Sequence, residues 1–379
     1  MEAKEYEARL SKLREEIDAI DGELLPLFLR RMGCSAQVAQ LKGEAGMPVF
    51  SPQREQAILD KVRAQGGEDG DAAAALYSSI MAISRAKQHL LLHGGASLRQ
   101  LEATAARTLP LEGARVVCQG VPGAFSHKAA LEFFGDISPA FVPTWKEAFE
   151  EVAAGKADYA VLPVENSAAG SVIGVYDLIL RYRFYIVGAV DVKVEHCLAA
   201  GKATGAPTAA VSHPQALSQC SEYLEAHGLR SIQWSNTAAA ARYVAQEAPA
   251  GVAAICSQEA AREYGLTILE EGIQNEAENT TRFILISREA ILPQDAGKIS
   301  LCFALPHVTG SLSGVLQRFA MAGLNLTKIE SRPLPGRNFE YDFYLDFTGN
   351  LHQPATLELI CALQEELPRF SFLGNYSER

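Results

Sequence analysis

The chain has 379 residues, of which 48% are hydrophobic and 21% are charged, so it is too long for a single compact core and too apolar for a disordered protein. Its formal net charge is −11 at pH 7, and this sign disfavours nucleic acid or an anionic membrane as the main partner. Seven scattered cysteines contain no Cys-x-x-Cys pair, which indicates reduced thiols rather than disulfides or zinc ligands. No secretory signal or membrane-spanning run is visible, so we expect a cytoplasmic protein of two or three domains.

Residues 1–93 are predicted to form an all-helical domain of three helices. In the first helix, apolar residues recur at alternating steps of three and four, at Leu10, Leu13, Ile17, Ile20, Leu24 and Leu27. Ser51, which precedes a proline, predicts the start of a second helix, and Asp71 that of a third. Pro26 lies inside the first helix and predicts a kink near Gly22. Three helices of unequal length make a thin core, so we expect a partner chain to complete it.

Residues 94–112 are predicted to be a linker, and the pattern changes after them. Over residues 113–289, short β-rich runs alternate with helices, which predicts an α/β architecture. A second linker follows at 290–297. Residues 298–379 then show the order strand, helix, strand, strand, helix, with a possible last strand at 369–373. This order is that of a ferredoxin-like βαββαβ domain.

Several polar residues of the helical segment can converge on one ligand. Lys42 follows Arg31 by eleven residues, which places both on one face of a helix. Arg14 precedes Arg31 by seventeen residues, about 25 Å along a helix axis, so it can reach the same ligand only from another subunit. Ser84 and Gln88, four residues apart, share one face of the third helix. The alternative is that all five are ordinary solvated or interhelical polar residues.

Motifs across nearly the whole segment resemble those of the all-helical chorismate mutase family: Leu13-Arg14-Glu15-Glu16-Ile17, Arg30-Arg31, Lys42, Arg54-Glu55 and Ser84-x-x-x-Gln88. The resemblance implies an intertwined dimer in which Arg31 and the partner subunit's Arg14 hold the two carboxylates of chorismate. It also implies that Lys42 and Gln88 contact the ether oxygen. The rearrangement to prephenate moves no proton, so it needs only a fixed conformer and stabilisation of negative charge on that oxygen.

The same resemblance implies three further pocket residues. Glu55 binds the substrate hydroxyl, while Arg54 and Ser84 line the pocket. The chain departs from the family at Ser51, where the family has an aspartate that helps to bind the hydroxyl. Ser51 is also the predicted helix cap. A mutase domain weakened by Ser51 and Pro26 is therefore kept as an alternative.

Four polar turns of the middle segment are each predicted to follow a strand and open a helix: Gly120–Ser126, Pro163–Ser167, Ser212–Gln215 and Ser235–Thr237. Each Ser, Thr or Asn in them is first of all a helix cap. Together, several helix starts at one cleft predict an anion site built from backbone N–H groups and hydroxyls. Gly120-x-x-Gly123 lacks the third glycine and the acid of a dinucleotide fingerprint. We therefore expect no cofactor, and we expect no metal.

These turns closely resemble the prephenate dehydratase family in Gly-Val-Pro-Gly-Ala-Phe-Ser-His at 120–127, Leu-Pro-Val-Glu-Asn-Ser at 162–167, Ser-His-Pro-Gln at 212–215 and Thr281-Arg282-Phe283. The resemblance implies two α/β lobes, similar to type II periplasmic binding proteins, with the active site between them. Prephenate would lose carbon dioxide and hydroxide there. The resemblance also puts Thr281 beside the leaving hydroxide, with Asn166, Ser212 and Gln219 as neighbouring contacts. Glu165 is the other acid candidate, or else a structural carboxylate.

The remaining substrate contacts predicted for the middle segment are Ser126, Ser167, Thr237, Arg282 and Phe283. Arg282 can pair with a substrate carboxylate or with the protein. The protein is favoured, because an alternating strand points Arg282 away from Thr281. His127 and His213 follow cap residues and are interpreted as imidazoles that pack in turns.

Two C-terminal motifs resemble the ACT domain that accompanies these dehydratases: Gly310-Ser311-Leu312 at a helix start and Glu330-Ser331-Arg332-Pro333 at a strand end. The resemblance implies that L-phenylalanine binds there, at a dimer interface, and inhibits. Ser311 and Ser313 depart from the family's Gly-Ala-Leu-Val, and polar groups there can lower affinity for an apolar ring. The alternative is a dimerisation module without a ligand.

Together, the resemblances imply a homo-oligomeric bifunctional chorismate mutase and prephenate dehydratase of phenylalanine biosynthesis. Two alternatives stay open. The dehydratase substrate could be arogenate, which carries an amino group in place of the keto oxygen, or the chain could be a non-enzymatic small-anion binding module.

Overall fold

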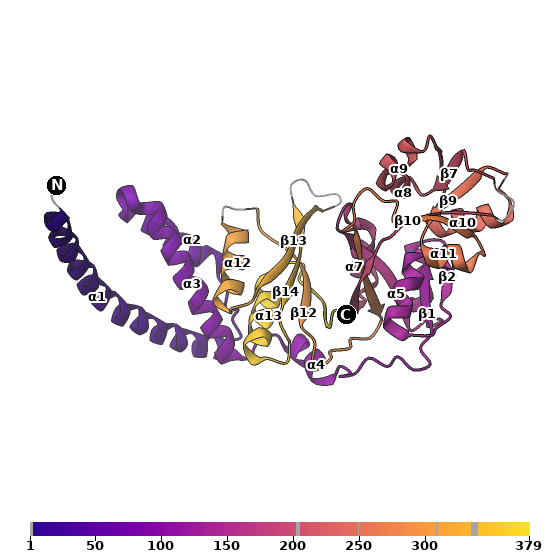
Figure 1. Cartoon of the computed structure of the whole chain (residues 1–379). Helices are drawn as coiled ribbons and strands as arrows, with labels where there is room; N and C mark the ends of the chain where they lie inside the picture. The colour runs from indigo at the N-terminus through magenta and orange to yellow at the C-terminus, as the bar shows by residue number, and fades with distance from the viewer. Residues whose placement is uncertain (1–2, 202–204, 249, 308–309, 335–339) are drawn as a thin grey trace.

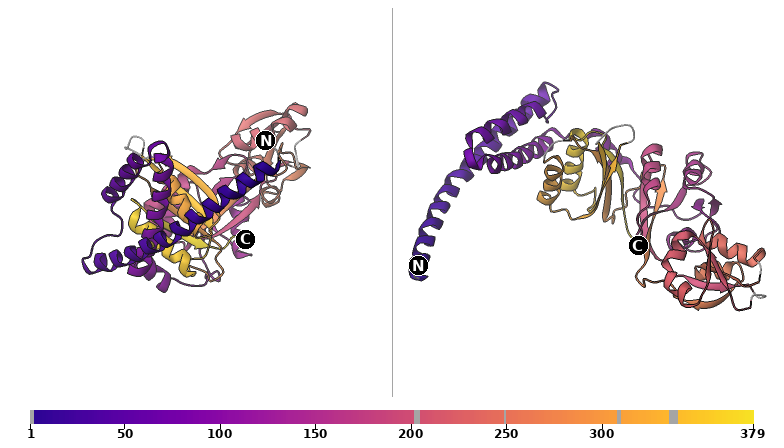
Figure 2. Two further views of the ribbon diagram at one scale, coloured as in Figure 1. Left: turned by 90° about the vertical axis from the view of Figure 1, so that its left-hand side faces the viewer. Right: turned by 90° about the horizontal axis from the view of Figure 1, so that it is seen from above.

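The computed structural model describes residues 3–201, 205–248, 250–307, 310–334 and 340–379. The chain forms an elongated molecule with a helical domain at one end and two α/β lobes at the other (Figure 1). The C-terminal domain lies between them, although it comes last in the sequence, and the view from above shows the same arrangement (Figure 2).

The helical domain contains three long helices and a short 3-10 turn: α1 (Ala3–Glu44), α2 (Pro52–Gln65), η1 (Gly67–Asp69) and α3 (Gly70–Leu92). Ser51 occupies the N-cap position of α2, so this helix starts where it was predicted, while α3 begins one residue after Asp69 rather than at Asp71. The predicted kink near Gly22 is wrong, because α1 is one continuous helix through Pro26 and bends gradually (Figure 1). Pro26 lacks a backbone N–H, but it lies in an exposed stretch, where water can bond the carbonyl that is left without a partner.

The first half of α1 projects away from the rest of the chain (Figure 2). Its apolar face is at least half exposed at each of Leu13, Ile17, Ile20, Leu24 and Leu27. Only the second half packs on α3, where Met32, Ser35 and Ala39 are buried. An apolar helical stripe of this length, open to water, is typical of a surface that another chain covers.

The first lobe is built on a six-stranded sheet of order β2-β1-β3-β11-β5, with β4 paired to β3. The strands of this sheet are β1 (Val116–Gln119), β2 (Ala140–Val142), β3 (Tyr159–Asn166), β4 (Gly170–Ser171), β5 (Tyr185–Lys193) and β11 (Thr280–Ser287). Strand β11 runs antiparallel to both β3 and β5. The helices of this lobe are α5 (Phe125–Phe134), α6 (Trp145–Ala153) and α7 (Ile173–Tyr182).

The second lobe has a five-stranded sheet of order β10-β6-β9-β7-β8. Its strands are β6 (Cys197–Ala200), β7 (Ala209–Ser212), β8 (Arg230–Gln233), β9 (Val252–Cys256) and β10 (Thr267–Glu271). Its helices are α8 (Pro214–Gln219), α9 (Ser221–Ala226), α10 (Thr237–Gln246) and α11 (Gln258–Glu263). The chain passes between the lobes after β5 and again after β10, which confirms the predicted pair of α/β lobes.

The C-terminal domain has the predicted βαββαβ order. Its sheet, of order β13-β14-β12-β15, consists of β12 (Lys298–Ala304), β13 (Leu326–Pro333), β14 (Tyr341–Thr348) and β15 (Ser371–Tyr376). Helices α12 (Ser311–Met321) and α13 (Pro354–Glu366) pack with alternate β12 residues, Ile299, Leu301 and Phe303, in one apolar core. The other face of the sheet packs on the first lobe, where Cys302 and Tyr344 join the core that contains Tyr176.

The segment expected to be a linker contains helix α4 (Ala96–Thr104). Leu98 of α4 is buried in the core of the C-terminal domain. In the part of the chain that the structure describes, no helix is long and apolar enough to cross a membrane. The seven cysteines are all unpaired in this structure, and six of them are buried.

Two candidate active sites

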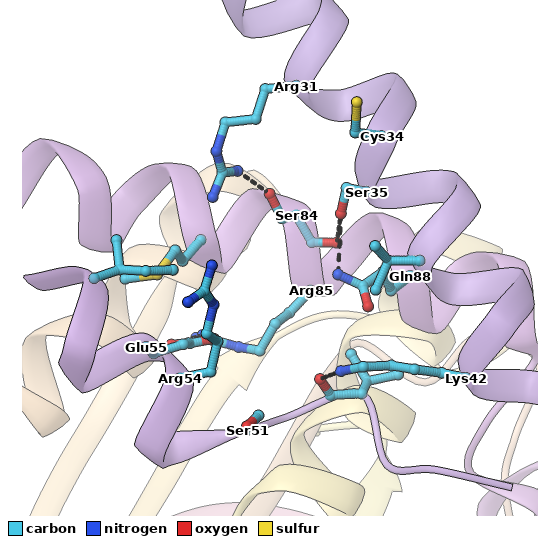
Figure 3. Close-up of a pocket in the computed structure, with 14 residues that line it drawn as sticks. Arg31, Cys34, Ser35, Lys42, Ser51, Arg54, Glu55, Ser84, Arg85 and Gln88 are labelled. Atoms are coloured by element: carbon cyan, nitrogen blue, oxygen red, sulfur yellow. Dashed lines mark hydrogen bonds and ion pairs between the residues drawn. The ribbon is translucent and has the colours of Figure 1, made fainter. Parts of the chain in front are cut away.

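The helical domain holds a pocket of about 490 Å³ between α1, α2 and α3. Side chains from all three helices line it (Figure 3). Six of the predicted mutase residues are among them: Arg31, Lys42, Arg54, Glu55, Ser84 and Gln88. The helical periods of three separate segments thus bring the predicted polar residues together around one cavity.

Hydrogen bonds within the protein fix several of these side chains. Arg31 Nη1 donates to Ser84 Oγ at 2.6 Å, and Lys42 Nζ donates to the carbonyl of Val49. Gln88 Nε2 donates to Ser35 Oγ at 3.0 Å, while its Oε1 is buried without a partner among the described residues. A rigid, cation-rich cavity of this kind suits a small substrate with two carboxylates.

Arg14 does not line the pocket, because it lies in the projecting half of α1. As the spacing of Arg14 and Arg31 predicted, Arg14 lies too far along the helix to reach the pocket of its own chain. Ser51 does line the pocket, at the start of α2, but its hydroxyl makes no capping hydrogen bond.

Arg85 is a pocket residue that sequence reasoning missed. Its Nη1 donates to both carboxylate oxygens of Glu55, and its guanidinium lies 5.0 Å from the centre of the Phe50 ring. Arg85 directly follows the predicted Ser84, but nothing in the sequence pattern marks it, because its role arises from contacts between helices.

A second cavity, of about 260 Å³, contains residues of both lobes. The first lobe contributes Asn166 and Thr281, and the second contributes Gln219 and Thr237. These are four of the predicted dehydratase residues. The cavity also contains groups that were not predicted as substrate contacts, namely Gln119, Phe125, Trp145, Val194, His196, His213, Gln215, Ala216, Ser235 and Asn236.

Thr281 is held as an oriented hydroxyl group. Strands β11 and β3 place it opposite Asn166, whose Nδ2 donates to Thr281 Oγ1 at 2.9 Å and to Asn279 Oδ1 at 2.7 Å. Since the Thr281 oxygen accepts a hydrogen bond from Asn166, its own proton is available for a ligand in the cavity. This geometry fits the predicted donor to a departing oxygen.

His196 is the main cleft residue that the sequence analysis missed. It is buried at the passage from β5 to β6, and its Nε2 lies 3.0 Å from Gln219 Oε1. A carbonyl oxygen can only accept, so Nε2 carries the proton. Burial lowers the pKa of His196 below its usual value, which keeps the ring neutral near pH 7. His196 therefore fixes the Gln219 amide without adding charge to the cleft.

Ser212 is not a cleft residue, which corrects one of the predicted contacts. It is fully buried, and its hydroxyl donates to the carbonyl of Ile255 at 2.6 Å. Helix α8 starts two residues later, and His213 is its cap. Side chains alternate in direction along β7, and that of Ser212 points into the second lobe rather than toward Thr281 and Asn166, its predicted neighbours.

Four other predicted contacts also lie outside the cavity. Ser126 is buried and donates to the carbonyl of Gln119 at 2.7 Å. Ser167 bonds the backbone beside Thr281 rather than facing the cavity. Phe283 belongs to the core of the first lobe. Arg282 pairs with Asp191 at 2.9 Å and with Glu378 at 3.4 Å, as the alternation along its strand favours.

Glu165 lies on the opposite face of β3 from Asn166 and does not line the cavity. Its carboxylate is 3.5 Å from Lys328 of the C-terminal domain. The structure therefore gives Glu165 a structural contact and leaves Thr281 as the predicted donor in the cleft.

Three of the four predicted turns follow a strand and open a helix, since those at 120–126, 212–215 and 235–237 lead into α5, α8 and α10. Asn236 accepts from the N–H of Ala239 and caps α10, and the turn at 212–215 opens α8. The turn at 163–167 instead ends β3 and leads into β4, and Ala124 rather than Ser126 is the cap of α5. His127 accepts from the N–H of Gly123 and packs on Phe141, as interpreted.

The two predicted ligand motifs of the C-terminal domain face different surroundings. Gly310 adopts a positive φ of 84° at the start of α12, and Leu312 packs in the domain core. Arg332 faces the first lobe, 3.5 Å from Asp177, and Glu330 pairs with Arg332 at 3.0 Å. The exposed members of the motifs are Gly310, Ser331 and Pro333, and Ser311 is half-buried.

Each of the two sites lies in a segment that matches a known protein family. The chorismate mutase type II family matches residues 13–89, and the prephenate dehydratase family matches residues 116–291. Bifunctional chorismate mutase/prephenate dehydratase of Aquifex aeolicus (strain VF5) is 32% identical over 373 residues, 97% of each chain. Arogenate dehydratase/prephenate dehydratase 6 of Arabidopsis thaliana is 37% identical, over 82% of this chain and 81% of its own.

Two solved structures share much of the fold. One is prephenate dehydratase from Arthrobacter aurescens in complex with L-Phe, at 31% identity and a TM-score of 0.63, covering 69% of this chain and 89% of that one. The other is GqqA, described as a novel type of quorum quenching acylase, at 30% identity and 0.64, covering 70% and 98%. Since the Aquifex relative spans both sites from end to end, the chain belongs to the family of bifunctional chorismate mutase/prephenate dehydratases.

Proposed function

We propose that this chain rearranges chorismate to prephenate in the helical pocket and converts prephenate to phenylpyruvate, carbon dioxide and water in the cleft. The observation that carries the proposal is the presence on one chain of two separate cavities, each lined by the residues that its reaction needs. The first cavity offers cations, and the second offers neutral donors. This difference matches a charge-stabilised rearrangement followed by loss of a hydroxide.

In the helical pocket, Arg31 binds one substrate carboxylate and Lys42 faces the ether oxygen. Chorismate rearranges in one step, so catalysis consists of holding the compact conformer and stabilising negative charge on the oxygen of the breaking bond. The Lys42 ammonium has two further protons beyond the one given to Val49. Gln88, held by Ser35, directs its amide into the same space.

In the cleft, the Thr281 hydroxyl donates a hydrogen bond to the departing hydroxide of prephenate. The bond between the ring and its carboxylate breaks at the same time and releases carbon dioxide. The electron pair of this bond completes the aromatic ring as the bond to the hydroxyl breaks. Asn166 aims the Thr281 hydroxyl, and Gln219 and the start of α10 offer neutral donors to the anionic groups of the substrate. The driving force is aromatisation, so an oriented donor is sufficient.

Incubation of the pure protein with chorismate tests the whole proposal. Phenylpyruvate formation supports both activities, whereas accumulation of prephenate shows an inactive dehydratase and unchanged chorismate shows a binding protein. The alternative that arogenate is the substrate stays open because the printed name of the plant relative gives both activities. The ratio of kcat/KM for prephenate and for arogenate decides between them.

The active mutase unit is proposed to be a homodimer in which the projecting half of α1 covers the other chain's pocket. The exposed stripe of α1 supports this, as does the position of Arg14 outside its own pocket. Mixing the variants Arg14→Ala and Arg31→Ala, each inactive alone, is expected to restore about a quarter of the wild-type mutase rate after refolding, because half of the dimers are mixed and each has one intact pocket. Chorismate consumption measures it, and no recovery would contradict a shared site.

The C-terminal domain is proposed to bind L-phenylalanine and to inhibit the dehydratase. The support is its ACT-like fold and the L-Phe complex of the Arthrobacter relative. Isothermal titration with L-phenylalanine is expected to give saturable heat, together with a loss of phenylpyruvate formation. Absence of both would show that the domain serves only for dimerisation.

A further inference from the structure

Glu366, the last residue of α13, is a buried carboxylate in an unfavourable position. Its side chain is 5% exposed, and the C-terminus of a helix repels negative charge. Three basic side chains surround it: Arg85 Nε at 3.1 Å, Arg318 Nη1 at 2.8 Å and His89 Nε2 at 2.7 Å. Arg85 and His89 belong to α3 of the helical domain, so this carboxylate joins the C-terminal domain to the mutase domain.

Arg85 bridges two carboxylates that belong to different domains. Its Nε faces Glu366, and its Nη1 donates to both oxygens of Glu55. The guanidinium group is a rigid plane, so anchoring one edge also sets the direction of the other. Glu55 lines the mutase pocket (Figure 3). The position of this pocket carboxylate therefore depends on a residue 311 positions further along the chain.

We propose that Glu366 is a positioning residue of the mutase site: it anchors Arg85, which holds Glu55 in place to bind the hydroxyl of the chorismate-like substrate. The inference rests on the proposed mutase function and adds that the C-terminal domain completes the mutase site. Glu55 binds the hydroxyl in both the ground state and the transition state, so loss of its orientation acts mainly on substrate binding.

The test is the substitution Glu366→Gln, which keeps the size of the side chain and removes its charge. The KM for chorismate is expected to rise about tenfold, with kcat changed by less than about twofold. Arg85→Gln is expected to give the same split. Dehydratase turnover of prephenate supplied directly should stay at the wild-type value, because neither residue contacts the cleft.

A matched control lies on the same helix. Glu358 of α13 pairs with Arg99 of α4 at 2.6 Å and does not contact the mutase domain through this pair, so Glu358→Gln should leave the KM for chorismate unchanged. The double variant Glu55→Gln with Glu366→Gln should have the same KM for chorismate as Glu55→Gln alone, because Glu366 acts through Glu55. A merely structural role would instead multiply the two effects.

If the wild-type chain rearranges chorismate, any of three results would overturn the inference. The first is an unchanged KM for chorismate in Glu366→Gln, and the second is a multiplication of the effects of Glu366→Gln and Glu55→Gln on this KM. The third is an equal rise of the KM in Glu358→Gln. Thermal unfolding shows whether Glu366→Gln folds, and if it does not, Arg85→Gln decides by the same measurements. A wild-type chain that leaves chorismate unchanged would instead refute the proposed mutase function itself.

Discussion

Replacing Thr281 by valine is expected to lower phenylpyruvate formation from prephenate by about 10²- to 10³-fold, the loss typical when one oriented donor to a developing negative charge is removed. Valine keeps the shape of threonine and removes only the hydroxyl that Asn166 aims into the cleft. Chorismate consumption should be unchanged, because the mutase pocket is formed by the helices of a different domain. A coupled assay that follows both compounds measures the two rates on one preparation.

The neighbouring Thr280 supplies the control for this prediction. It lies on the same strand, β11, and does not line the cavity, so Thr280→Val should retain dehydratase activity. Thr281→Ser keeps a hydroxyl and should recover most of the rate. Full turnover in Thr281→Val would refute the role of this hydroxyl, and Asn166 or Gln219 would then have to supply the donor.

Replacing Lys42 by glutamine is expected to lower the mutase kcat by about 10²- to 10³-fold. The amide still reaches toward the ether oxygen but carries no positive charge, and the transition state of the rearrangement has more negative charge on that oxygen than the substrate has. The reaction is followed by the loss of chorismate. Turnover of added prephenate should stay at the wild-type value, because Lys42 lies in the other site.

Lys87 provides a matched substitution on the same domain. It is exposed on α3 and is not among the pocket residues, so Lys87→Gln removes a charge without changing the site and should leave the mutase rate within about twofold, as for most surface substitutions. An equal loss in both variants would mean that overall charge, rather than the ammonium group of Lys42, drives the effect.

The sequence predicted the architecture because each domain carries its own clear pattern. Short β-rich runs between helices indicated the strands of the two lobes, and apolar residues at steps of three and four indicated α1. The predicted kink at Gly22 failed because a proline in an exposed part of a long helix loses one hydrogen bond that water replaces. The helix in the expected linker was missed because α4 is short and is stabilised by contacts of Leu98 with a distant core.

The site residues were predicted less completely than the fold. Thr281 and Asn166 could be paired only through a family resemblance, since 115 positions separate them. The burial of Ser212 depends on which face of β7 it occupies, and a four-residue buried strand shows no alternation of polarity from which to infer this. Arg85 and His196 take their roles from partners on other elements, so no local motif marks them.

The placement of the C-terminal domain between the other two has a consequence for synthesis on the ribosome. The mutase helices emerge well before α13, yet Glu366 of α13 neutralises the buried end of Arg85. Helix α4 likewise waits for strands that are translated some two hundred residues later. Until α13 is made, the nascent mutase domain therefore exposes the Nε edge of Arg85 and the ring of His89 on α3, and both reach their final partner only when the C-terminal domain docks.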